Sequence, residues 1–583
     1  MSKSMDHNEK LNRRDFFTLA AGAAAMSIVS PLVAGETPNG SKKSEKVKPI
    51  LTNKPNILFV FTDQERFFHH LPKGYRLPAH ERLQKEGMSF QNHYVSATMC
   101  TSSRSVMFTG LQTANNGMFD NADMGYIKPL SPSIPTVGHR LREGGYYTAY
   151  KGKWHLNRDF EADHTAEYFE NEMDKYGFSD FTHAVDHEAH TLGGYYNDDA
   201  ITSSALSWLR EKGQKINQNN QPWSLFVSLV NPHDVMYFNT DKEGESIQDN
   251  GNLMMSAARA PHNRRYQAEW SMSIPKNFTQ PFEEAGRPKA HGEFSKAWGY
   301  VLGNVPTDAM AWKRLQDFYL NSLRAVDEQL ERLLNELDEL GLRENTVIVF
   351  TADHGEMGGA HGLRGKGPFA YEESIHVPFY IAHPKIKGGI KTAALSSHID
   401  IVPTLLDIAG SLSSDGNLPG KSLFSVLKKE KAKVRDGVLF TYSGIATNDS
   451  ETIRIFSEAK RAKEDPKAAL QRLGYRPNFK KRGSLRCVFD GRYKFTRYFA
   501  PIERNQPKTL EEILKWNDVE LYDLKNDPSE MNNLAKDPQK HVSLIEEMNR
   551  KLAQLIEAEI GRDDGREMPK LENVHWEVDK IDL

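Results

Sequence analysis

Four apolar runs in the sequence end in side chains that can bind a metal or carry a proton. The runs NILFVFTDQ, YYTAYKGKWH, WSLFVSLVNPH and TVIVFTADHG end on Asp63 and Gln64, on Lys153 and His155, on Asn231 and His233, and on Asp353 and His354. Two carboxylates, an amide oxygen and an imidazole suit Ca²⁺ or Mg²⁺, and the histidine admits Mn²⁺ as well. We therefore expect a divalent metal site formed by Asp63, Gln64, Asp353 and His354.

Cationic and titratable side chains accompany these ligands. Arg104, Lys153 and Lys366 place positive charge beside the expected metal, which indicates an oxyanion as the bound group. His155 and His233 are natural general acids and bases because an imidazole titrates near neutral pH. A single polar cluster after an apolar run is often only a turn or a helix cap, but four such clusters favour an active site. The residues alone predict a metal-assisted hydrolase of a sulfate or phosphate ester, and their spacing does not distinguish the two.

The elements that would position these residues are strands alternating with helices. The four runs are rich in Val, Ile, Phe and Tyr, which is typical of buried strands in a parallel sheet. HIDIVPTLLDIAG predicts a helix with Asp400 near its start and Gly410 just past its end. A second helix is predicted by the apolar spacing of Leu323, Val326, Leu330, Leu333, Leu337 and Leu340. This alternation predicts an α/β sheet with helices on both faces, in which ligands bind beyond the carboxyl ends of the strands.

The pattern also divides the chain into segments. Residues 55–420 are expected to form the catalytic α/β domain, with an insertion over the mouth of the site at about 234–313. Residues 421–583 are expected to form a smaller α+β domain. There, GVLFTYSG and SLRCVFDGRYKFTRYF predict antiparallel strands that turn at Asp490–Gly491, and a helix over 541–560 is expected to pack on them.

The amino terminus predicts export. NRRDFF, with the pair Arg13–Arg14, precedes an alanine-rich apolar run that ends near Ala34 and is short for a membrane span. We predict a twin-arginine signal peptide at 1–34 and a flexible linker at 35–54. The twin-arginine translocase would then be a partner. We expect a periplasmic or secreted protein without a membrane segment after cleavage.

The composition argues against general binding to nucleic acid or membranes, and one of the two cysteines lies in an unusual context. The 583 residues carry a formal net charge of −3, which gives no general attraction to nucleic acid or to anionic membranes. The two cysteines, Cys100 and Cys487, are too few for a disulfide framework. Cys100 lies in the run SATMCTSSRSVMFTG, whose polar residues Ser102, Ser103 and Arg104 fit poorly with a cysteine that is only a small core hydrophobe.

The segment around Cys100 resembles a known signature. CTSSRSVMFTG is similar to that of the type I, formylglycine-dependent sulfatases of the alkaline phosphatase superfamily. GKWH, NPH, ADHGEMGGAHGLRGKG and ELYDLKNDPSEMNNLA resemble the family's other motifs, in order from about Pro55 to Ala535. The resemblance implies a large, mostly parallel sheet sandwiched by helices and a smaller C-terminal domain with an antiparallel sheet. It also implies hydrolysis of a sulfated carbohydrate, or of an aryl or alkyl sulfate, to alcohol and sulfate.

The resemblance further implies a mechanism. In these sulfatases a maturation enzyme oxidises the signature cysteine to formylglycine (3-oxoalanine), whose hydrate is the nucleophile. Carried over, Cys100 becomes a diol on the metal, with Ca²⁺ expected, and Arg104 steadies it. One hydroxyl attacks sulfur, and the other, deprotonated by a base such as His155, collapses to the aldehyde and ejects sulfate. Lys153 and Lys366 would hold the sulfate oxygens. His233 would lie near the leaving oxygen as an acid.

Some positions depart from the family pattern. Ser102 stands where the family usually has Pro or Ala, and Asp63–Gln64 and Asp353–His354 stand where many sulfatases have Asp-Asp and Asp-Asn. The combination found here also occurs in choline sulfatases and phosphonate monoester hydrolases, so a phosphonate monoester or phosphodiester hydrolase is the alternative enzyme. A sugar-binding protein on the same scaffold, with Cys100 unconverted, is the non-enzymatic alternative. It is disfavoured because none of the expected metal or cationic residues is missing.

Overall fold

The computed structural model describes residues 52, 54–162, 164–182, 191–251, 253–412 and 418–569. The predicted signal peptide at 1–34 and nearly all of the predicted linker lie outside these ranges. Within them, every helix is too short or too polar to cross a lipid bilayer.

An eight-stranded sheet forms the centre of the structure, in the order β4-β3-β5-β1-β6-β7-β2-β8. The strands are β1 (Asn56–Asp63), β2 (Met88–Tyr94), β3 (Tyr147–Gly152), β4 (Ser179–Thr182), β5 (Trp223–Pro232), β6 (Thr346–Ala352), β7 (Phe379–Ala382) and β8 (Ile390–Ser397). Strands β4, β3, β5, β1 and β6 pair in parallel, and β7 is antiparallel to both of its neighbours. The four runs predicted as strands are β1, β3, β5 and β6, which are consecutive in the sheet.

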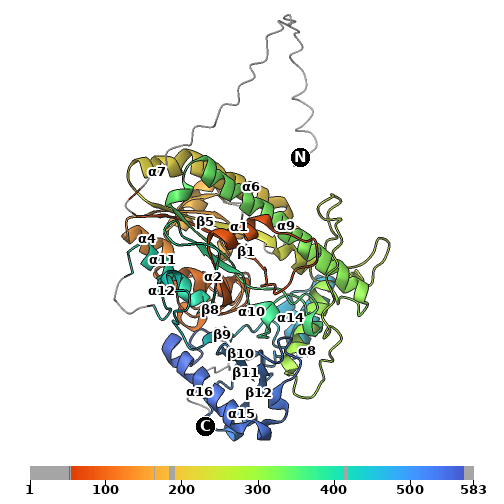
Figure 1. The fold of residues 1–583 in the computed structure, drawn as a ribbon. Coiled ribbons are helices and arrows are strands. Elements are labelled where there is room, and N and C mark those ends of the chain that lie inside the picture. Colours follow the sequence, from red (N-terminus) through yellow and green to blue (C-terminus); the bar gives the residue numbers. More distant parts are fainter. Residues whose placement is uncertain are drawn as a thin grey trace, which may run out of the picture. The chain divides into compact units, whose positions relative to one another are not determined.

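Helices cover both faces of this sheet (Figure 1). Along β1, Ile57 and Phe59 face one cluster of core residues and Leu58 and Val60 face another, because successive strand side chains alternate. The first face packs against α2 (Cys100–Thr109), α4 (Val137–Glu143) and α11 (Ile401–Ile408). The second packs against α1 (Pro78–Glu86), α6 (Gly193–Trp208) and α9 (Ala309–Glu339). The helix predicted from leucine spacing is confirmed as α9, and the helix predicted after Asp400 is α11.

The C-terminal part contains a four-stranded antiparallel sheet in the order β12-β11-β10-β9. Its strands are β9 (Val438–Tyr442), β10 (Ser484–Phe489), β11 (Tyr493–Phe499) and β12 (Asp518–Asp523). The predicted hairpin turns at Asp490–Gly491, where Gly491 has a φ of +97°. Helix α16 (Val542–Glu559) packs on the sheet, as predicted. The sequence did not predict β12, α13 (Ser450–Ala462) or α14 (Pro466–Leu473).

The segment expected as an insertion, at about 234–313, opens with the short helix η3 (His233–Tyr237). Its described residues after η3 form neither helix nor strand until α8 (Lys289–Leu302), and α9 begins at Ala309, inside the predicted range. Trp298 of α8 and Met255 pack against Met236 and Tyr237 of η3. This packing places the segment beside the strand ends, where the candidate site lies.

Candidate active site

The predicted strand ends meet in one buried site. Asp63 ends β1 and Gln64 follows it, Lys153 and His155 follow β3, His233 follows β5, and Asp353 and His354 follow β6, while Lys366 lies in the loop beyond η5 (Ala360–Gly362). Because these four strands are parallel and adjacent, their carboxyl ends lie at the same edge. The side chains assembled there are all buried: Asp63, Gln64, Lys153, His155, His233, Asp353, His354 and Lys366.

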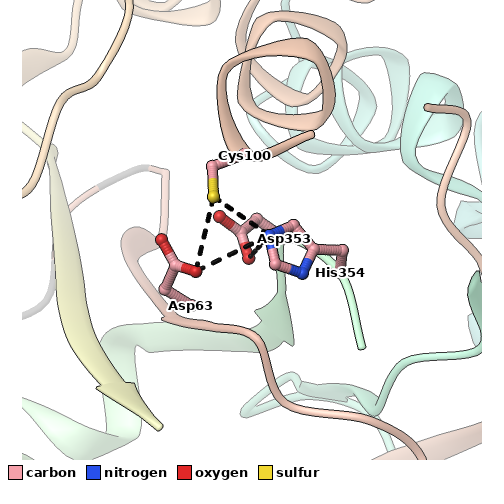
Figure 2. A group of neighbouring side chains, drawn as sticks. All are labelled: Asp63, Cys100, Asp353 and His354. Carbon is pink, nitrogen blue, oxygen red and sulfur yellow. Dashed lines mark hydrogen bonds and ion pairs between the residues drawn. The ribbon is translucent and has the colours of Figure 1, made fainter. Parts of the chain in front are cut away.

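Cys100 reaches this edge from the opposite direction, as the first residue of α2 (Figure 2). Its Sγ lies 3.1 Å from Nε2 of His354 and 3.7 Å from Oδ1 of Asp63. One ligand atom from each of Asp63, Cys100, Asp353 and His354 lies within 4.8 Å of all the others. These donors fit a hard divalent cation, because the Oδ1 atoms of two buried carboxylates and an imidazole nitrogen converge there.

Arg104 balances the two carboxylates. Its Nη2 donates to Oδ2 of Asp63 and its Nε donates to Oδ2 of Asp353, both at 2.9 Å, and its side chain is 0% exposed. Its Nη1 donates to the Lys153 carbonyl and to the Ser228 hydroxyl, also at 2.9 Å. Arg104 therefore fixes the two carboxylates relative to each other and to strands β3 and β5.

The two lysines are held by other site residues. Lys153 Nζ donates to Oδ2 of Asp63 at 2.8 Å, and Lys366 Nζ donates to Oε1 of Gln64 at 2.7 Å. The Gln64 amide nitrogen donates to Glu356, whose carboxylate also accepts from the backbone of the following glycine-rich loop. The Gln64 side chain thus lies between Lys366 and Glu356, and its role as a metal ligand stays a prediction.

The backbone turns sharply where the strands end. Gln64 and His155 have φ values of +74° and +59°, which is uncommon for residues other than glycine and is typical of functional sites. Gly152, with a φ of +94°, comes so close to β5 that a Cβ would lie 2.0 Å from the Ser228 carbonyl oxygen. Only glycine fits there, and this close approach places Lys153 over the site.

Burial and charge set the protonation of the carboxylates. Burial alone would raise the pKa of Asp63, but Lys153, His233 and Arg104 outweigh it and hold the pKa well below its ordinary value. Burial and the negative charge of Asp63 raise the pKa of Asp353 to about 7. One carboxylate is therefore ionised at neutral pH and the other titrates, as expected for two acids that share a cation site.

The histidines and the cysteine are held in their neutral forms. Burial, followed by the charge of Lys153 and Arg104, keeps the pKa of His155 well below its usual value. Burial also lowers the pKa of His233 and of His354. Burial beside Asp63 raises the pKa of the Cys100 thiol to about 12, so an unmodified Cys100 is not a thiolate nucleophile at neutral pH.

Sequence reasoning missed several residues that support the site. Ser228 lies inside the apolar run of β5, and Glu356 follows the predicted ligands within ADHGEMGG, where its carboxylate could have signalled a role. Ser103 binds the Asp353 carbonyl and the His398 imidazole, which lies on a segment far along the chain.

The sheet with carboxylates, histidines and cations gathered at its strand ends, beside a cysteine at a helix start, is the arrangement expected from the resemblance to the alkaline phosphatase superfamily. Within it, the chain belongs to the sulfatase family, because the model of that family, described as Sulfatase, matches residues 55–411. The protein is therefore a sulfuric ester hydrolase.

Individual relatives agree with this assignment. The chain is 29% identical over 415 residues to the N-acetylglucosamine-6-O-sulfatase of Bacteroides thetaiotaomicron, covering 65% of this chain and 72% of the relative. It is 24% identical to the choline-sulfatase of Rhizobium meliloti, covering 84% and 83%.

Solved structures share the fold. A protein in complex with its substrate D-glucosamine-2-N,6-O-disulfate matches with a TM-score of 0.61 and 20% identity, covering 88% of this chain and 99% of that one. The phosphonate monoester hydrolase of Silicibacter pomeroyi matches with a TM-score of 0.60 and 18% identity, covering 87% and 96%.

Proposed function

We propose that the protein is an exported sulfatase that acts through Cys100 converted to formylglycine beside a divalent metal. The observation that carries this proposal is the position of the Cys100 side chain, buried at the start of α2 and directly against Asp63 and His354. An unmodified thiol would be a poor nucleophile there, because burial keeps it protonated.

The residues present fit the metal that the family implies. Asp63, Asp353 and His354, with Gln64 beside them, would hold Ca²⁺, with Mn²⁺ or Mg²⁺ as alternatives. The ion would act as a Lewis acid that stabilises negative charge on the sulfate oxygens. The formylglycine hydrate would supply a hydroxyl nucleophile together with a second hydroxyl that allows sulfate to be expelled.

The protein's own side chains would bind the sulfate and move protons. Lys153 and Lys366 provide cations within the site, where they would hold sulfate oxygens. Arg104 keeps the carboxylates in place. His155, neutral because it is buried, can accept a proton as the base. His233 is also neutral in the free site, where its N–H can donate a hydrogen bond to the leaving oxygen, and it would act as the acid once the negative charge of the bound sulfate favours its protonated form.

The substrate class, location and partners complete the proposal. The names of the relatives support a sulfated carbohydrate or an aryl or alkyl sulfate as substrate, since they include enzymes acting on N-acetylglucosamine 6-sulfate, ulvan and choline sulfate. NRRDFF supports twin-arginine export to the periplasm or beyond. A formylglycine-generating enzyme and the translocase are the partners that this pathway requires.

A phosphonate monoester or phosphodiester hydrolase is the second candidate. It is favoured by the Asp63–Gln64 and Asp353–His354 pairs and by the phosphonate monoester hydrolases among the similar structures. Rates on an aryl sulfate, an aryl phosphonate monoester and an aryl phosphate diester, measured on one preparation, would separate the two. A higher kcat/KM for the phosphonate would favour the alternative.

Peptide mass spectrometry of the exported protein tests the covalent part of the proposal. Conversion of the thiol to the aldehyde should make the Cys100 peptide lighter by roughly 18 Da. Cys487, buried in β10, is an internal control that should keep its thiol mass. Full activity on sulfate esters with an unmodified Cys100 would refute the proposal.

A further inference from the structure

A cavity of about 430 Å³ opens directly onto Cys100. Three of the proposed catalytic residues, Cys100, His155 and His233, form part of its lining. A group bound at the cysteine would therefore continue into this cavity, whose volume suits a drug-sized organic molecule. In a sulfate ester, that continuing group is the alcohol part of the substrate.

The apolar walls of the cavity come mainly from two separate parts of the chain. One wall belongs to α8 and the segment before it, and the other to α13 and the residues that flank it, while residues 120–126 contribute a more polar part of the lining. The apolar side chains that line these walls are Met236, Met254, Met255, Trp298, Val301, Ile445, Ile453, Phe456 and Phe479. Such walls favour a ligand that buries a broad apolar surface.

Buried carboxylates in the lining are already bound by the protein. Asp120 accepts hydrogen bonds from the Tyr126 hydroxyl at 2.6 Å and from the Ile445 backbone N–H at 3.1 Å. Asp449 accepts from the Tyr475 hydroxyl and from Lys481 Nζ, both at 2.6 Å. These groups have little capacity left for the hydroxyls of a sugar, which would need many hydrogen-bond partners.

The cavity also lacks positive charge. Among the described residues that line it, none is lysine or arginine, whereas Asp120, Asp123, Glu161 and Asp449 are acidic. Lys153 and Lys366 contact Asp63 and Gln64 at the sulfate end. A second sulfate on the alcohol would therefore lie among like charges without a cation, which disfavours its binding.

Further cations line a separate, neighbouring cavity. It has a volume of about 510 Å³ and meets the first cavity at Thr447, which lines both. Two of its four cations are balanced, since Lys481 pairs with Glu293 and Asp449, and Arg482 pairs with Asp518, while Lys289 and Lys480 are exposed.

We propose that the substrate is the monosulfate of a large, uncharged and largely apolar alcohol, for which a tetracyclic alcohol serves as the probe. This inference rests on the proposed sulfatase function and specifies its substrate. Met255 on one wall and Phe456 on the other determine the preference, by packing against the apolar body of the alcohol.

Three sulfate esters test the inference. A tetracyclic secondary alkyl monosulfate and cyclohexyl sulfate have similar leaving groups but differ in apolar area, and a disulfated glucosamine adds a second charge. With mature, Cys100-modified enzyme, we expect kcat/KM for the tetracyclic ester to exceed that for cyclohexyl sulfate by about tenfold or more, from the added apolar contact. The disulfate should be the poorest substrate.

Matched variants identify the walls. Met255→Ala and Phe456→Ala should each lower the ratio of kcat/KM between the tetracyclic and cyclohexyl esters by about fivefold. Met310→Ala removes a methionine that is 52% exposed on α9, outside the cavity, and should leave the ratio unchanged. Because each wall has its own variant, the test still gives a result if one of the two variants fails to fold.

The outcomes separate this inference from the proposed function. A higher kcat/KM for the disulfate than for the tetracyclic ester, or an unchanged ratio in both wall variants, would overturn the inference while leaving a sulfatase. Release of sulfate from none of the three esters, with cleavage of an aryl phosphonate monoester, would overturn both.

Discussion

Replacing Arg104 with methionine tests whether this arginine compensates the paired carboxylates. The substitution keeps an unbranched apolar stem but removes both 2.9 Å hydrogen bonds to Asp63 and Asp353. All three side chains are 0% exposed, so water cannot replace the lost charge. Removing one partner from such a buried ion pair typically costs about 3–5 kcal/mol, and we expect a loss of this size in the free energy of unfolding.

The loss should depend on the metal. A bound divalent cation supplies positive charge to the same two carboxylates, so the difference between wild type and Arg104→Met should be smaller in excess Ca²⁺ than in a chelator. Urea unfolding of the Cys100-unmodified protein, carried out in both conditions, measures this difference.

Arg497 provides a matched control. It is also a buried arginine, but its Nη1 donates to the carbonyl and the side-chain oxygen of the neutral Asn505, and Asp563 acts on it through its charge without a hydrogen bond. Arg497→Met should cost only about 1–2 kcal/mol and should not respond to Ca²⁺. Equal losses in the two variants, or a loss in Arg104→Met that is the same with and without Ca²⁺, would refute the assignment of Arg104 as the charge partner of a metal site.

Three further predictions follow from the site. Because the pKa of Asp353 is raised to about 7, Ca²⁺ must displace a proton below that pH, so its affinity should fall about tenfold per pH unit from pH 7 to pH 5 and should level off above pH 8. Titration calorimetry measures this affinity, and a flat pH profile would contradict the prediction. His233→Ala should slow sulfates of poor leaving groups more than activated aryl sulfates, and equal slowing would argue against its role as the acid. Gly152→Ala would bring a Cβ to 2.0 Å from the Ser228 carbonyl oxygen, whereas Gly145 also has a positive φ but has no atom within 4 Å of its Cβ position. Urea unfolding should therefore show Gly152→Ala to be less stable than Gly145→Ala by at least about 2 kcal/mol.

The sequence predicted the central sheet and the gathering of the strand-end residues because both follow from local patterns. An apolar run that stops at Asp63 or at Asp353 marks a strand and its end, and parallel strands bring their ends to one edge. The turn at Asp490–Gly491 could also be predicted, because an Asp-Gly pair between two strands is typical of a hairpin turn. Gly491 has a φ of +97°, which suits glycine.

The contacts within the site could not be predicted in the same way. Ser228 looks like one small residue in an apolar strand, and only the pairing of β5 with its neighbours shows that it faces Arg104. Lys366 binds Gln64 across 302 positions of sequence, a contact that no local spacing reports. Helix α13, which forms one wall of the cavity, has an amphipathic pattern that could be read locally, but no local spacing shows that it lies beside α8 at the site.

The burial of α2 has a consequence for the time at which Cys100 can be reached. All ten residues of this polar helix are buried, and Ser103 is bonded to His398, 295 residues later in the chain. That contact cannot form until His398 has been synthesised, so the helix is expected to dock late. At about 5–20 residues per second, the ribosome needs about 15–60 s to extend the chain over that distance. A maturation enzyme that reads the nascent signature segment would have this interval in which to act. The separation of Ser103 from His398 along the chain would thus limit the time available for the proposed modification, and a faster ribosome would shorten it.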